Sequence, residues 1–258
     1  MRLDLSSDLP AVRDRLRAAF GTVRPHRRLD PVSQLVKTMV SARTYDEVSW
    51  AAFVRLRAAF GDWNALAGAA PADIEPIIDP VTFADEKARR IPEALRQICE
   101  ARSDLDLDFL KDLPLDEAMA WLARLSGVGV KGAACVLNFS TLARPALVVD
   151  THVHRATRRL GLAPRTGDTD GAYAALMEQA PIDWDAEDFF ELHWLIKPHG
   201  QSICTHFDPA CGLCVLRDLC PRIGLAPAPS AMKPQADGPV RPQPQPAPGR
   251  QPEAAGPW

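Results

Sequence analysis

The chain has 258 residues, 47% of them hydrophobic, so it is long enough to bury one large core or two smaller ones. Its formal net charge of −3 argues against a protein that binds polyanions through an overall positive charge. No apolar run reaches about 18 residues, and residues 1–16 lack the apolar segment of a signal peptide. We therefore expect a cytoplasmic protein without membrane contact.

Apolar residues recur at helical spacing along most of the chain. A first helix is expected over residues 8–20, where Gly21 ends it, and a second after Asp30, which suits an N-cap followed by Pro31. No convincing alternating strand pattern occurs, so the predicted fold class is all-α. Further helices are expected at about 47–60, 63–67, 71–78 and 85–101, from 114, from 130, from 150, and at about 168–178 and 186–197.

Two glycines, Gly127 and Gly129, separate two of these helical patterns. Glycine tolerates positive φ, so the pair can reverse the chain from one helix into the next. The second helix would begin near Val130, and its unpaired first N–H groups would attract an anion such as a phosphate. Lys131 then lies in the first turn, where the helix dipole disfavours an ammonium and suits a nucleophile. A plain helix corner with a solvated lysine is the alternative interpretation.

Asp150 lies nineteen positions after Lys131, directly before the next helical pattern. Its residue type suits an N-cap, and capping alone would explain it. An N-cap carboxylate can also project toward a cleft, so capping and a role in chemistry are compatible.

A net charge is an average over the surface and does not exclude a local basic patch near the hairpin. The candidates are Arg24, Arg27, Arg28, Lys37, Arg43, Lys87, Arg89, Arg90, Lys131, Arg155, Arg158 and Arg159.

Four of the six cysteines are crowded into one segment with the spacing C-x6-C-x2-C-x5-C. In a reducing compartment such clustering favours a metal centre over disulfides. Four thiolates can hold either zinc or a 4Fe-4S cluster. Zinc ribbons usually contain two C-x2-C pairs and only one is present here, so the spacing favours the iron–sulfur cluster. The expected ligands are Cys204, Cys211, Cys214 and Cys220.

The C-terminal segment has a different composition from the rest of the chain. Ten of the 24 prolines lie after Leu225, interleaved with alanine, glutamine and glycine. Such a composition cannot form a packed core, so residues 225–258 are expected to be a disordered, proline-rich tail.

Three motifs together resemble the endonuclease III family of helix-hairpin-helix DNA glycosylases, whose members carry an iron–sulfur cluster. The segment LSGVGVKGA at 125–133 is similar to the family's hairpin L-P-G-V-G-x-K-T-A. VDTHVHR at 149–155 is similar to V-D-T-H-V-x-R, and the cysteine spacing matches at every position. Weaker similarity covers roughly residues 30–222.

The resemblance implies two α-helical domains with DNA bound across the cleft between them. Residues 33–143 would form a helical barrel domain that ends in the hairpin. Residues 1–32 and 144–224 would together form a discontinuous domain that carries the 4Fe-4S cluster.

By the same resemblance, Lys131 corresponds to the catalytic lysine and Asp150 to the catalytic aspartate. The hairpin backbone would hold a DNA phosphate, often with a monovalent cation, and Phe83 corresponds approximately to a residue that wedges into the base stack. Arg43 stands where many members have a glutamine that fills the gap left by the flipped base. The implied DNA-binding residues are Gly127, Val128, Gly129, Arg43 and Phe83.

The implied activity is that of a base-excision repair DNA glycosylase with abasic-site lyase activity, acting by β-elimination on oxidised pyrimidines. The implied partner is double-stranded DNA that contains damaged bases or abasic sites. The protein would be a monomer of the bacterial type, associated with the nucleoid.

The chain departs from the family pattern at several positions. Ser126 replaces the hairpin proline, Gly132 replaces the threonine after the lysine, and Arg43 replaces the gap-filling glutamine. The loop between Cys204 and Cys211 carries Asp208 where relatives often have basic residues, so weak DNA affinity is expected through this loop. The departures leave the preferred lesion open.

Two other functions remain as alternatives. An adenine- or other mismatch-specific glycosylase of the same superfamily lacks the lysine and uses a glutamate, at a position where this chain has Thr38. A non-catalytic DNA-binding or redox-sensing iron–sulfur protein is suggested by Gly132, Arg43 and the acidic cysteine loop.

Overall fold

The computed structural model describes residues 8–225, so the predicted tail, apart from Leu225, lies outside the described residues. The described part is helical, with no strand and one isolated parallel β-bridge between Leu29 and Ser140. The predicted all-α fold class is confirmed. None of these described helices is long and apolar enough to cross a membrane.

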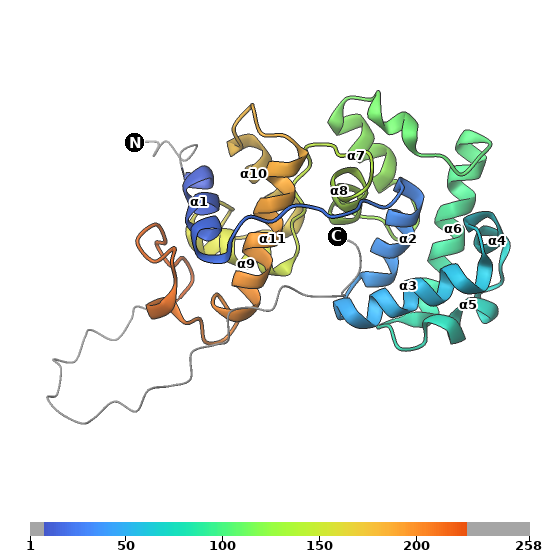
Figure 1. The fold of residues 1–258 in the computed structure, drawn as a ribbon, viewed down its shortest axis with the longest axis horizontal. Coiled ribbons are helices and arrows are strands. Elements are labelled where there is room, and N and C mark those ends of the chain that lie inside the picture. Colours follow the sequence, from blue (N-terminus) through green and yellow to red (C-terminus); the bar gives the residue numbers. More distant parts are fainter. Residues whose placement is uncertain (1–7, 226–258) are drawn as a thin grey trace, which may run out of the picture.

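The helices begin and end close to the predicted positions. Figure 1 shows them in two groups, with α2 to α8 in one and α1, α9, α10 and α11 in the other. Their bounds are α1 (Asp8–Phe20), α2 (Pro31–Ser41), α3 (Asp46–Phe60), α4 (Trp63–Gly68), α5 (Pro71–Ile78), α6 (Ala84–Arg102), α7 (Leu115–Ala123), α8 (Val130–Phe139), α9 (Thr151–Leu160), α10 (Thr169–Gln179) and α11 (Ala186–Ser202), with 3-10 turns η2 (Asp108–Lys111) and η3 (Cys211–Leu213).

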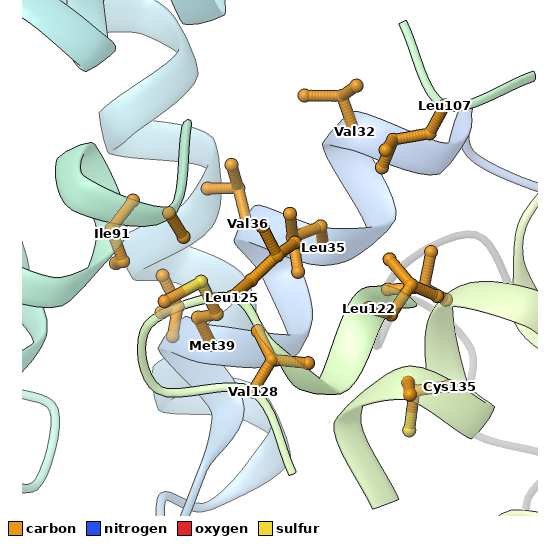
Figure 2. Close-up of a cluster of buried hydrophobic side chains, with 14 of the residues drawn as sticks. Val32, Leu35, Val36, Met39, Ile91, Leu107, Leu122, Leu125, Val128 and Cys135 are labelled. Carbon is orange, nitrogen blue, oxygen red and sulfur yellow. The ribbon is translucent and has the colours of Figure 1, made fainter. Parts of the chain in front are cut away.

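The larger hydrophobic core lies among α2 to α8. Helix α2 is its centre, because it packs against α3, α6 and α8. Figure 2 shows Leu35, Val36 and Met39 of α2 beside Leu125 and Val128 of the hairpin. The hairpin is therefore anchored by apolar side chains on α2, the same helix that forms one wall of the cavity that contains Lys131 and Asp150.

A second hydrophobic core joins segments that are far apart in the chain. Leu9, Val12 and Leu16 of α1 pack with buried residues of α9, α10 and α11. Asp30 caps α2 by accepting a hydrogen bond from the backbone N–H of Ser33 at 2.8 Å. Because α1 packs in the smaller core and α2 in the larger one, the linker between these two helices runs from one core to the other.

The short segment before α9 belongs to both cores. Ala146 and Val148 are buried in the larger core, whereas Leu147 and Val149 are buried in the smaller one. Alternate residues of an extended chain point to opposite sides, so each core holds every second side chain. This segment, residues 146–149, is called the seam below, and it ends at Asp150.

Two features of the helices differ from the sequence expectation. Helix α11 continues through Pro198 to Ser202, although the predicted helix stops near residue 197. The end of the helix lies closely against α9, since a Cβ on Gly200 would lie 2.9 Å from His152 Cβ. The two 3-10 turns were not expected.

The boundaries of the two domains stay a prediction. The two hydrophobic cores support a division of this kind, although Phe190 of α11 packs in the larger core.

A buried carboxylate ties α1 to α11. Glu191 is fully buried, and its Oε1 accepts hydrogen bonds from Arg17 Nε at 3.0 Å and from the Val23 N–H at 3.3 Å. Burial alone would raise the pKa of Glu191, but the Arg17 guanidinium and the Val23 N–H outweigh it and hold the pKa below its usual value.

We predict that Glu191→Gln lowers the free energy of unfolding at pH 7 by about 2 kcal/mol, since the buried ion pair is broken while the shape is kept. A depressed pKa gives stability that is present above about pH 4.3 and is lost as the pH falls through the folded value. The deficit should therefore shrink at pH 3.5 in urea titrations. An equal deficit at both pH values would contradict a charge-based role.

Candidate active site

The hairpin between α7 and α8 uses its two glycines differently. Gly127 has a positive φ of 76°, and a Cβ there would lie 3.0 Å from Arg90 Cδ. Gly129 has a φ of −100° and is the N-cap of α8, with open space where a Cβ would be. Only Gly127 therefore needs glycine for its backbone conformation.

The middle residue of the hairpin faces the core. Val128 is buried, and its backbone N–H donates to Leu125 O at 3.0 Å. That N–H group is already used within the turn. The N–H groups that an α-helix leaves without a helical acceptor are those of its first turn, which here begins at Val130.

Gly132, where the family has threonine, is buried on the first turn of α8. A Cβ at this position would lie 3.2 Å from Val128 Cγ1 and 4.0 Å from Thr38 Cγ2. A side chain here would require Val128 to shift, which gives this departure from the family pattern a packing reason.

Lys131 and Asp150 line one cavity. Its walls come from α2, α3, α8, α11 and the end of the seam. The structure thus brings together the two predicted catalytic residues, which are nineteen positions apart in the sequence. The other ionisable residues that line the cavity are Lys37, Asp46, Cys135, His193 and Lys197.

Asp150 is the N-cap of α9, as its residue type predicts. Its Oδ1 accepts hydrogen bonds from the backbone N–H groups of His152 at 2.9 Å and Val153 at 2.8 Å. Both bonds use the same oxygen, so Oδ2 is left out of the cap. Burial alone would raise the pKa of Asp150, but His193, the Val153 N–H and Lys197 outweigh it and lower the pKa. The carboxylate is therefore charged at neutral pH.

Two buried bases in this cavity were missed by the sequence reasoning. Burial lowers the pKa of His193 to about 4, and its Nδ1 lies 2.8 Å from Val148 O, so the imidazole is neutral and donates to the seam. Lys37 is 5% exposed, and burial lowers its pKa to about 7. No motif marks either residue, because its burial and its pKa are determined by helices from other parts of the chain.

An ion pair joins two helices at the cavity. Lys197 Nζ of α11 lies 2.7 Å from Asp46 Oδ2 at the start of α3, and it also lies 4.7 Å from the centre of the Trp194 ring. Asp46, Trp194 and Lys197 were likewise not predicted as site residues. Trp194 and Lys197 lie in an apolar helical pattern that indicates core packing, and Asp46 lies in a polar segment between two helical patterns.

A second pocket, of about 680 Å³, brings together three predicted DNA-binding residues, Arg43, Phe83 and Gly127. Arg43 and Phe83 both have left-handed backbone conformations, with φ of 55° and 57°. This conformation is costly for residues other than glycine and often marks functional sites. The Arg43 guanidinium lies 5.7 Å from the centre of the half-exposed Phe83 ring.

The four predicted cysteine ligands line a third pocket. Burial raises the pKa of the Cys214 and Cys220 thiols, and the neighbouring cysteines raise it further. Backbone and guanidinium N–H groups approach the sulfurs, with Leu216 N 3.4 Å from Cys214 Sγ and Arg159 Nη1 3.3 Å from Cys204 Sγ. Within residues 8–225, no three His, Cys, Asp or Glu side chains form a site for a single metal ion.

Two arginines of α9 hold the cysteine loop. Arg155 donates to Cys204 O at 2.9 Å and Gly200 O at 2.6 Å, and Arg159 donates to Thr205 O at 2.6 Å and His206 O at 2.8 Å. Arg159 is buried, and so are Lys37 and Lys87, so these three candidates do not contribute to a basic surface patch. Arg155 is half-buried and stays a candidate.

The chain is similar in sequence to known DNA repair proteins. Residues 36–181 match the HhH-GPD superfamily of base excision DNA repair proteins. The chain is 36% identical to endonuclease III of Synechocystis sp. over 196 residues, which are 74% of this chain and 81% of that one. It is 33% identical to endonuclease III of Thermotoga maritima, over 76% of this chain and 85% of that one. It spans only 57% of an Arabidopsis thaliana protein named as a DNA glycosylase, at 33% identity.

Solved structures show the same fold. A non-covalent endonuclease III–DNA complex matches with a TM-score of 0.68 at 23% identity, covering 84% of this chain and 95% of that one. A thermostable thymine-DNA glycosylase matches with a TM-score of 0.63 at 17% identity, covering 84% of this chain and 96% of that one. The chain belongs to the HhH-GPD superfamily of base excision DNA repair proteins, as an endonuclease III homologue.

Proposed function

We propose that this base excision repair DNA glycosylase and abasic-site lyase uses Lys131 as its nucleophile and Asp150 as its catalytic carboxylate, and acts on oxidised pyrimidines in double-stranded DNA. The observation that carries the proposal is the shared cavity, which holds the only pair that the sequence motifs single out for chemistry. The monomeric state is part of the same proposal.

The reaction follows from the residues of this cavity. A damaged nucleotide is extruded from the duplex at a cost of a few kcal/mol, which damage reduces. The uncharged amine of Lys131 attacks C1′, the base departs, and a Schiff base forms that permits β-elimination of the 3′ phosphate. The Asp150 carboxylate, fixed by the start of α9, stabilises the positive charge that develops on the sugar.

DNA is held by the hairpin and the second pocket. The first-turn N–H groups of α8 are suited to a phosphate oxygen. Arg43 and Phe83 share a pocket with Gly127, which supports the proposal that they fill the space that an extruded nucleotide leaves. A monovalent cation at the hairpin stays a prediction.

The alternative functions fit the cavity less well. Thr38 lines the cavity at the position expected for the glutamate of an adenine-specific glycosylase, and its Oγ1 accepts a hydrogen bond from Gln34 Nε2 at 3.1 Å. A threonine cannot supply the carboxylate that such an enzyme uses. Lys131 and Asp150 in one cavity, at the spacing of the family motifs, favour the enzyme over a non-catalytic module.

The first prediction from the proposed function concerns the nucleophile. With wild-type protein and abasic duplex DNA, borohydride should trap a covalent adduct and strand cleavage should follow, and Lys131→Ala should lose both. Gel electrophoresis of the reduced mixture measures both. Absence of an adduct in the wild type would contradict the proposal and favour the non-catalytic alternative.

A second prediction separates capping from chemistry at Asp150. Asparagine is as good an N-cap as aspartate, so Asp150→Asn should change the free energy of unfolding by less than about 1 kcal/mol. The missing carboxylate should slow single-turnover cleavage of abasic duplex DNA by about 100-fold. Wild-type rates in this variant would reduce Asp150 to a structural cap.

A third prediction uses the two glycines as a matched pair. Gly127→Ala should lower the free energy of unfolding by about 1 to 2 kcal/mol, because alanine is strained at positive φ and Arg90 must move. Gly129→Ala should cost less than about 1 kcal/mol but should weaken DNA binding, since its methyl group enters the space where a phosphate would lie. Equal losses of stability would contradict this assignment of the hairpin.

We further propose that Cys204, Cys211, Cys214 and Cys220 hold a 4Fe-4S cluster, which the shared pocket and the N–H groups at its sulfurs support. A cluster with four protein sulfurs offers no open iron to substrate, so it would order the loop or carry electrons.

The proposed cluster predicts about four irons per chain in anaerobically purified protein, with absorbance near 400 nm. Cys211→Ser should lower the iron content. One zinc per chain with no iron would overturn the cluster assignment without touching the proposal for Lys131.

A further inference from the structure

A second lysine lies in the catalytic cavity, in a place that is unusual for this residue type. Lys37 is in the middle of α2, and its side chain is 5% exposed. Lysine is among the residue types that are least often fully buried. Lys37 lines the same cavity as Lys131 and Asp150, together with its helix neighbours Gln34 and Thr38.

The surroundings of Lys37 favour its uncharged form. Burial is the largest effect and lowers the pKa to about 7, and the positive charges of Lys197 and Lys131 act in the same direction. Cys135 and Asp46 oppose them, although the Cys135 thiol is itself buried and has a raised pKa. The remaining ionisable groups on neighbouring elements are Asp150, His193 of α11 and Lys87 of α6, whose Nζ is bonded to Val40 O and Ala42 O at the end of α2.

The lyase step proposed above needs a proton acceptor. Once Lys131 has formed the Schiff base, the C2′ proton must leave before the 3′ phosphate can. Asp150 is a weak base, because its pKa is held low and its Oδ1 is bound to the start of α9. Proton transfer is most efficient when the pKa of the base lies near the working pH.

We propose that Lys37 is the catalytic base of the β-elimination, an inference that rests on the proposed role of Lys131. The lone pair of Lys37 Nζ takes the C2′ proton, and the C–H electrons form the C1′–C2′ double bond while the iminium nitrogen becomes neutral. The nitrogen lone pair then re-forms the iminium as C2′–C3′ becomes a double bond. The C3′–O bond breaks, and the phosphate leaves with that electron pair.

The positive charge of the iminium strengthens this assignment. It appears on Lys131, which already lowers the pKa of Lys37, so the second amine stays uncharged when a base is needed.

The test is Lys37→Met with abasic duplex DNA under single-turnover conditions from pH 5.5 to 9. We expect wild-type cleavage to rise through an apparent pKa near 7, and the variant to cleave about 100-fold more slowly without that rise. Borohydride should still trap the Lys131 adduct at wild-type yield. The thermal midpoint should increase at pH 7, because the variant removes a buried amine, and this increase shows that the protein is folded.

The second variant is Lys37→Gln, which keeps a polar end group in the cavity. Its β-elimination should be slowed as in Lys37→Met. Lys111→Met is the matched control, since Lys111 is a surface residue paired with Asp108 at 3.1 Å, and its kinetics should equal those of the wild type. Wild-type rates and pH profiles in both Lys37 variants would overturn the inference. The inference would also be overturned if folded Lys37 variants lost both the borohydride adduct and strand cleavage. No adduct in the wild type would instead contradict the proposed function itself.

Discussion

The structure depends on the seam, the four residues that carry alternate side chains into the two hydrophobic cores. Neither core can shift along the seam without exposing apolar residues of the other, because a one-residue slip exchanges the two faces. The seam ends at Asp150, and Val148 O also receives the hydrogen bond of His193. The position of the Asp150 carboxylate relative to α8 is therefore set by the packing of both cores.

Burial where the two cores meet affects the charges of the groups that line the cavity. Three lysines and two carboxylates line a space enclosed by α2, α3, α8 and α11. Such a set of charges is costly in a poorly solvated place, and the protein lowers the cost in three ways. Lys197 pairs with Asp46, Asp150 accepts two N–H groups at a helix start, and Lys37 loses part of its charge.

Most of the fold could be predicted from the sequence, because helix starts are marked by local residues such as Asp30, Asp150 and the hairpin glycines. Lys131 and Asp150 were predicted as site residues because motifs single them out, and the structure brings them to one cavity. Lys37 and His193 could not be found in this way, since a lysine or histidine within a helical pattern has no distinct signal. Their pKa values are set by residues of other helices, as are the roles of Arg155 and Arg159 at the cysteine loop.

The central claim is that Lys131, and neither of the other two lysines in the cavity, bonds to the sugar. Mass spectrometry of the proteolysed adduct, after borohydride reduction on abasic duplex DNA, tests this claim directly. The account predicts that the sugar remnant lies on the peptide that contains Lys131. A remnant on Lys37 or Lys197 would contradict it.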